Sequence, residues 1–104
     1  VPEGFWIKDS KWIIRLFEDP DFVAKVKERF HYFNTNRNFL FDGIDENAKY
    51  LNFAQAENDS TWQTLGVYVW PNNEVFDTYD EEVEYLKQWI EQRFDWLEVA
   101  IGGL

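Results

Sequence analysis

Apolar residues recur every three or four positions in the first third of the chain, which is the spacing of helices with one buried face. The first such segment predicts a short helix from Lys11 to about Glu18. Asp19 and Pro20 then predict a new start, because aspartate caps a helix and proline fits its first position. The second helix is expected to run to about Tyr32–Asn34. Its predicted buried stripe consists of Phe22, Val23, Val26, Phe30 and Phe33.

The next pattern predicts one long helix from about Asn38 to Gln63. Its expected apolar face consists of Leu40, Ile44, Leu51, Ala54 and Trp62. Gly43 lies inside this helix, and we interpret it as a site of close packing or a mild kink. Asn47 and Asn58 fall within the same stripe. Because a buried amide needs hydrogen-bond partners, we expect each to bind the backbone of a loop, and a ligand-binding role is the alternative.

A connection from Thr64 to Asp77 follows, and it is longer than most links between helices. The segment Val67-Tyr68-Val69-Trp70 within it predicts either one short strand or a lid across the helices. Tyr68 and Trp70, together with Trp6 near the start of the chain, are candidate stacking platforms for a sugar ring.

The clearest pattern belongs to a fourth helix. Thr78 and Glu81 have the spacing of a capping box at its start, and Gly102-Gly103 is a natural stop. Its apolar residues cover about half the circumference, so one stripe faces the third helix and the other needs a second surface. The main stripe consists of Tyr79, Val83, Leu86, Ile90, Phe94, Leu97 and Ile101. Arg93 projects from within the apolar arc, so we expect its guanidinium to bind a carboxylate or backbone carbonyls as a structural contact, and a role in a functional site is the alternative.

These patterns predict a mostly α fold of three or four helices. The long third and fourth helices are expected to be antiparallel, with at most one short strand or hairpin elsewhere. A chain of 104 residues has room for a single domain, so we assign residues 1–104 to one helical domain or subdomain. Because the chain opens with Val1 rather than methionine, we expect it to be a piece of a longer gene product.

Composition narrows the range of partners. Twenty acidic against ten basic residues give a net charge of −10, which disfavours nucleic acid and anionic membranes. The same charge opposes self-association, so any homo-oligomer is expected to be weak. No segment is long and apolar enough to span a membrane, and no signal segment or lipobox is present. Aromatic residues make up 20% of the chain, more than a small domain readily buries, so we expect part of them to face a surface outside this segment.

Recognisable chemistry is missing from the sequence. The absence of cysteine and the single His31 leave few donors for a metal site. Phosphate-binding glycine loops and the nucleophile and zinc motifs of hydrolases are also missing. We therefore expect no catalytic, cofactor-binding or metal-ligating residue in this segment.

Three blocks of the sequence resemble the C-terminal helical region of the CotH kinase family, the family of spore coat protein H. The first block is Trp12–Arg29, the second is Ile44–Ala48 with Asn58 and Trp62, and the third is Tyr85–Leu97. The resemblance extends over nearly the whole chain and is most like the members from gut Bacteroidetes.

The resemblance implies an exported or cell-surface protein, often a lipoprotein, with an atypical protein-kinase fold. In that family the nucleotide and metal ions are held by residues upstream of the helical region, so none is carried onto this sequence. The implied role is a non-catalytic subdomain that buttresses the upstream kinase-like part of the same chain. A carbohydrate-binding module and a helical adaptor for a protein partner are the alternatives.

Overall fold

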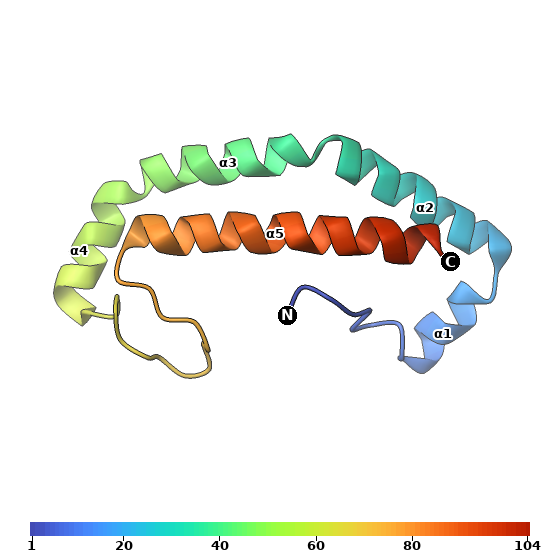
Figure 1. The fold of residues 1–104 in the computed structure, drawn as a ribbon, viewed down its shortest axis with the longest axis horizontal. Coiled ribbons are helices and arrows are strands. Elements are labelled where there is room, and N and C mark those ends of the chain that lie inside the picture. The colour runs from blue at the N-terminus through green and yellow to red at the C-terminus, as the bar shows by residue number, and fades with distance from the viewer. The chain divides into compact units, whose positions relative to one another are not determined.

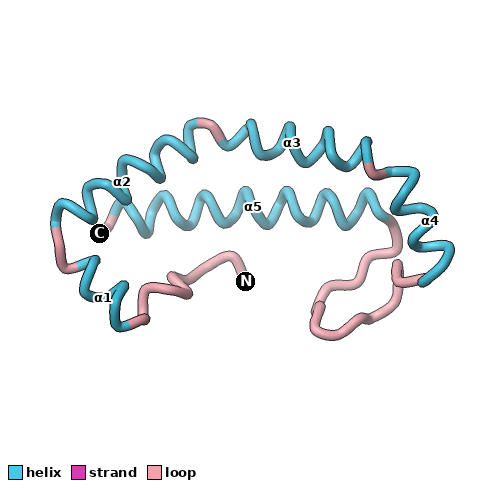
Figure 2. Tube along the Cα trace, turned by 180° about the vertical axis from the view of Figure 1, so that it is seen from behind, coloured by secondary structure: helices cyan, strands magenta, loops and turns pink.

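The computed structural model describes residues 1–104 and contains five helices and no strand, as Figure 2 shows. The helices are α1 (Lys11–Phe17), α2 (Pro20–Thr35), α3 (Arg37–Tyr50), α4 (Asn52–Trp62) and α5 (Tyr79–Gly102), labelled in Figure 1. The predicted mostly α class is confirmed, but the expected count of three or four helices is too low. The strand considered for Val67–Trp70 does not form, and the segment is a loop.

The additional helix arises because the predicted third helix divides at Leu51. Leu51 has φ −88° and ψ 0°, outside the helical range, and α4 turns away from the direction of α3 in Figure 1. Its amide still donates to Asn47 O at 2.9 Å and its carbonyl accepts from Gln55 N at 2.8 Å. The division is therefore a bend that keeps the helical hydrogen bonds. Gly43 is not the cause, and close packing there was wrong, since a Cβ at Gly43 would meet nothing within 4 Å.

The chain divides into two units, each described by itself. The first unit contains Val1–Asn38 and Trp89–Leu104, and the second contains Phe39–Gln88, so α5 contributes one half to each. In the first unit the rings of Phe30 on α2 and Phe94 on α5 stack with centroids 6.0 Å apart. Ile101 is 8% exposed and is the one residue of the chain that counts as buried.

Local sequence signals place two helix starts where they were expected. Asp19 Oδ1 accepts a hydrogen bond from Asp21 N at 2.9 Å and caps α2. At the start of α5, Thr78 Oγ1 accepts from Glu81 N at 3.2 Å. The Glu81 carboxylate reaches back to the amide of Asp77 at 3.1 Å, one residue earlier than the ideal capping box.

The second unit joins α3 to the first half of α5 through long side chains. Tyr79 Oη donates to Ala48 O at 3.2 Å, and Lys87 Nζ donates to Asp45 Oδ1 at 2.9 Å. The residue numbers rise along α5 as they fall along α3, so these two segments run antiparallel. On α4 only Gln55 and Asp59 are even partly buried, and this helix has little packing of its own.

Candidate functional site

Arg93 fastens the N-terminal arm, Val1–Ser10, to α5. Its Nη1 donates to the carbonyl oxygens of Pro2 and Gly4, both at 2.7 Å, and its guanidinium lies 5.2 Å from the Trp96 ring. The hydrogen-bond partners of Arg93 are thus backbone carbonyls, which are one of the two kinds of partner that the sequence predicted. No carboxylate takes part. Nη1 carries two N–H donors, so the two carbonyls accept from this nitrogen without adding a second charge.

Aromatic rings complete the attachment of the arm. Phe5 meets Trp96 edge-to-face with centroids 5.0 Å apart. Lys8 Nζ lies 5.2 Å from the Phe5 ring and 5.1 Å from the Phe17 ring of α1, within the range of cation–π attraction. The arm is therefore held by α5 on one side and tied to α1 on the other.

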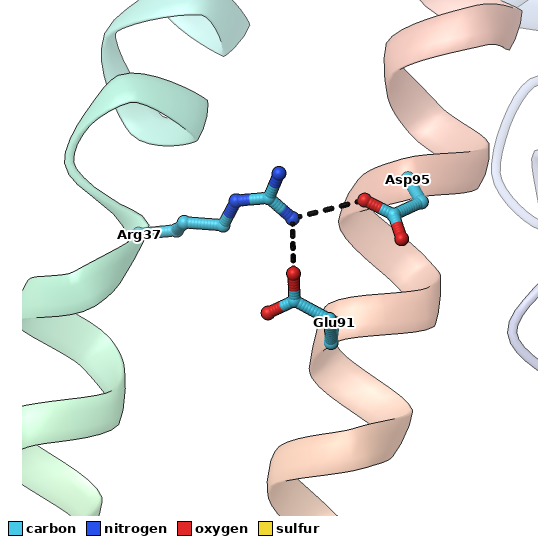
Figure 3. Close-up of polar contacts among 3 residues, drawn as sticks. All are labelled: Arg37, Glu91 and Asp95. Atoms are coloured by element: carbon cyan, nitrogen blue, oxygen red, sulfur yellow. Dashed lines mark hydrogen bonds and ion pairs between the residues drawn. The ribbon is translucent and has the colours of Figure 1, made fainter.

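Arg37 pairs with two carboxylates of the first unit. Its Nη1 lies 3.0 Å from Glu91 Oε1 and 3.0 Å from Asp95 Oδ1, as Figure 3 shows. The two carboxylates stand one turn apart on α5, and the guanidinium reaches between them from the start of α3. One positive group shared by two negative groups leaves an excess of one negative charge, and the contact ties the start of α3 to α5.

One buried side-chain polar atom in the first unit has no hydrogen-bond partner. Asn34 Oδ1 is buried, and its residue lines a small hollow of about 170 Å³ beside the end of α5. His31 and Glu98 line the same hollow. No pattern in the sequence pointed to this buried oxygen.

In the second unit, Lys87 is one of the residues that line a mixed-charge hollow of about 600 Å³. Its hydrogen bond to Asp45 raises the pKa of Lys87 above the usual value of 10.5, with weaker help from the charge of Glu84. Lys49, Asn52 and Asp80 also line this open hollow. The two lysines and the carboxylates around them give no preference for one charge of ligand.

The loop between α4 and α5 has a defined base. Gly66 N donates to Phe76 O at 2.8 Å, and Asp59 Oδ1 accepts from Leu65 N at 3.1 Å. Gly66 has φ +75°, and a Cβ there would meet the Asp77 carboxylate at 3.0 Å, so the turn favours glycine.

The candidate platform residues lie on that loop but do not share its hollow. Val67 and Val69 line an open hollow of about 360 Å³, whereas Tyr68 and Trp70 are exposed outside it. Trp6, the third candidate, is also exposed and belongs to the other unit.

The two asparagines do not occupy the buried positions expected of them. Asn47 and Asn58 are exposed, and neither side chain forms a hydrogen bond within the chain. The loop backbone is bound instead by Asp59, the neighbour of Asn58. The face of α3 and α4 that is packed in the structure differs from the face expected from the sequence by a rotation of about one residue around the helix axis.

The structure brings together no three acidic or histidine side chains that could hold a metal ion. None of its helices is long and apolar enough to cross a membrane.

Comparison with known proteins gives one match. The sequence model of the family described as CotH kinase protein matches residues 5–97. Neither a curated protein nor a solved structure matches the chain. Because the family match covers most of the chain, the protein belongs to the CotH kinase protein family.

Proposed function

We propose that this chain is a non-catalytic helical subdomain, the C-terminal part of an exported CotH-like protein, and that it buttresses an upstream kinase-like part of the same polypeptide. The observation that carries the proposal is the exposure of apolar surface. Ile101 alone counts as buried, while Trp6 and Trp12 are 71% and 83% exposed. A neighbour that covers such rings stabilises the chain by about 25 cal/mol for each Å² of apolar area removed from water.

The first unit supplies the buttressing surface in this proposal. Trp6 lies on the arm that Arg93 fixes, and Trp12 lies on α1, to which the arm is tied through Lys8. The two rings are therefore displayed on a supported surface rather than on a free terminus. Supported aromatic rings lose little conformational entropy when a neighbour covers them.

The experiment compares the thermal stability of the longer protein with and without these rings. Trp6→Ala and Trp12→Ala are expected to lower its Tm, because the upstream part loses apolar contact. Phe39→Ala is the matched control, since Phe39 is equally exposed but belongs to the second unit. If Trp12→Ala changes the Tm no more than Phe39→Ala does, the buttress role is wrong.

The proposal also states that phosphoryl transfer, if the longer protein performs it, depends on residues outside this chain. The 104-residue chain alone is expected to show no heat of binding with ATP and Mg²⁺ in calorimetry. Micromolar affinity for ATP would overturn this part of the proposal. Export is tested separately, by locating the tagged longer protein in cell fractions.

A carbohydrate-binding role is the second candidate, favoured by the exposure of Tyr68 and Trp70 on one loop. Flat exposed rings stack on sugar rings, and polar neighbours such as Asn72 then hydrogen-bond the hydroxyls. Retarded migration of the chain in gels that contain soluble polysaccharide, lost in Trp70→Ala, would support this role. Unchanged migration with a panel of polysaccharides would remove it.

A further inference from the structure

Aromatic and acidic side chains form a continuous stripe along α3 and α4. Its positions are three or four residues apart, the interval that keeps side chains on one face of a helix. We call this set the outer stripe, and it consists of Phe39, Asp42, Glu46, Tyr50, Phe53 and Glu57. All six residues belong to the second unit.

The outer stripe points away from the packed side of both helices. Phe39, Tyr50 and Phe53 are 82%, 85% and 76% exposed. The partly buried residues stand on the opposite face, among them Ile44, Ala48 and Asp59. No side chain of the stripe forms an ion pair or a hydrogen bond within the chain, although the charge of Asp42 helps to raise the pKa of Lys87. The rings and the carboxylates of Glu46 and Glu57 are thus free to contact another molecule.

The bend at Leu51 does not interrupt the stripe. The hydrogen bonds from Leu51 N to Asn47 O and from Gln55 N to Leu51 O keep the helical pitch through the bend. Tyr50 before it and Phe53 after it therefore remain on the same side. The stripe spans the length of about five helical turns. It follows the change of direction between α3 and α4 that Figure 1 shows.

We propose that the outer stripe binds an amphipathic helix of a second polypeptide that carries lysine or arginine beside its apolar residues. The interleaved carboxylates select for cations, and the rings offer both apolar contact and cation–π attraction to the same side chains. Regular spacing by three or four residues is the pattern that helices use to pack on one another.

The distribution of charge between the two units argues against three other occupants of the outer stripe, namely a second copy of the chain, nucleic acid and a neighbouring part of the same chain. The second unit has eleven acidic side chains and two lysines, whereas the first has nine acidic and eight basic ones. Two copies pairing stripe to stripe would set carboxylates against carboxylates, and nucleic acid would be repelled. A charge concentrated in this way accelerates the encounter of separate molecules, which a tethered neighbour of the same chain does not require.

The test uses a fluorescent peptide of about 18 residues, enough for five turns, with leucine and lysine at helical spacing. The control peptide has the same composition in a scrambled order that forms no apolar face. At about 0.15 M salt the helical peptide is expected to bind the chain at least about tenfold more tightly in anisotropy titrations. Equal affinities would mean charge attraction alone and would overturn the proposal.

Substitutions test whether the peptide binds to the outer stripe. Phe39→Ser combined with Phe53→Ser is expected to abolish the preference for the helical peptide. Val99→Ser, at a similarly exposed apolar side chain of the first unit, leaves it unchanged. Glu46→Lys weakens binding of both peptides, whereas Glu28→Lys on α2 has little effect. Circular dichroism checks that each variant keeps its helix content, and a preference that survives the double serine variant refutes the proposal.

Two further outcomes show whether the stripe is covered by a second copy of the chain, by the same polypeptide or by a separate protein. If the chain self-associates and the double serine variant does not, a second copy occupies the stripe and the proposal is wrong. If the longer protein fails to bind a peptide that the 104-residue chain binds, its own polypeptide covers the stripe, which also overturns it. Binding by both supports a separate partner.

Discussion

Replacing Arg93 with alanine is expected to release the N-terminal arm from α5. The side chain donates two hydrogen bonds of 2.7 Å, to the carbonyls of Pro2 and Gly4, and lies 5.2 Å from the Trp96 ring. Each hydrogen bond from a charged group contributes about 1.5–3 kcal/mol, and the cation–π contact about 0.5–1 kcal/mol. Because Arg93 is only partly buried, water replaces part of these interactions. We therefore expect a loss of about 2–3 kcal/mol.

Urea denaturation and amide hydrogen exchange together measure this loss. The Lys8 amide, which donates to Phe5 O at 3.2 Å within the arm, is expected to exchange faster in Arg93→Ala. Arg93→Lys recovers part of the stability, since an ammonium provides the charge but not the planar fork of donors. A double-mutant cycle with Phe5→Ala is expected to be non-additive, because both side chains fasten the same arm.

Arg29→Ala is the matched control for this prediction. Its guanidinium lies 4.8 Å from the rings of Tyr32 and Phe33 and forms no hydrogen bond, so its removal costs at most about 1 kcal/mol. The reasoning is refuted if Arg93→Ala is no more destabilising than Arg29→Ala and the Lys8 amide exchanges at the parent rate.

Three further predictions concern charged side chains elsewhere. Arg37→Ala is expected to destabilise the chain by about 1–2 kcal/mol in urea denaturation, because two carboxylates lose their shared partner, whereas Arg15→Ala changes stability by less than about 0.5 kcal/mol. Asp59→Ala removes the acceptor at the base of the loop and costs about 1 kcal/mol, with faster exchange of the amide it binds, whereas Asn58→Ala has no such effect. The raised pKa of Lys87 means that its stabilising contribution is complete below the usual value of 10.5 and is lost as the pH rises through the higher folded value. Lys87→Met is therefore expected to flatten the fall in stability at alkaline pH, and an unchanged pH profile would contradict it.

Helix starts could be predicted from the sequence because their signals are local. A helix start depends on contacts between residues no more than four positions apart, as at Asp19 and Pro20 for α2 and at Thr78 and Glu81 for α5. The acceptors of Arg93 could be predicted only as a type, since the identity of the two carbonyls depends on how an arm 89 to 91 residues away is folded.

The face of α3 and α4 could not be predicted, because both sides of these helices carry apolar residues. Phe41 and Ile44 lie on the packed side, while Phe39 and Phe53 lie on the exposed side. Periodicity assigns a single apolar face to a helix, so the predicted face fell between the packed side and the exposed aromatic side. That error of about one residue is what made Asn58 rather than Asp59 the expected partner of the loop.

The bend at Leu51 could not be predicted from the sequence for a different reason. Leucine is a strong helix former, and nothing in its neighbours ends a helix. The structure shows the division at Leu51, where α4 departs from the direction of α3 (Figure 1). Leu51 is 48% exposed and α4 has little packing, so neither helix propensity nor the apolar pattern indicates the bend.

Helix α4 links the stability of the second unit to the binding that we propose for it. An isolated helix shorter than about 12–15 residues is marginal in water, and α4 has 11 residues with little packed surface. A partner that contacts Phe53 and Glu57 would supply the tertiary packing that α4 lacks. Since a ligand of the folded state stabilises it by RT ln(1 + [L]/Kd), the cationic peptide is expected to slow exchange of the α4 amides more than those of α2. Equal protection of both helices would indicate binding elsewhere, so the local response of α4 is a test of the outer stripe that does not depend on any substitution.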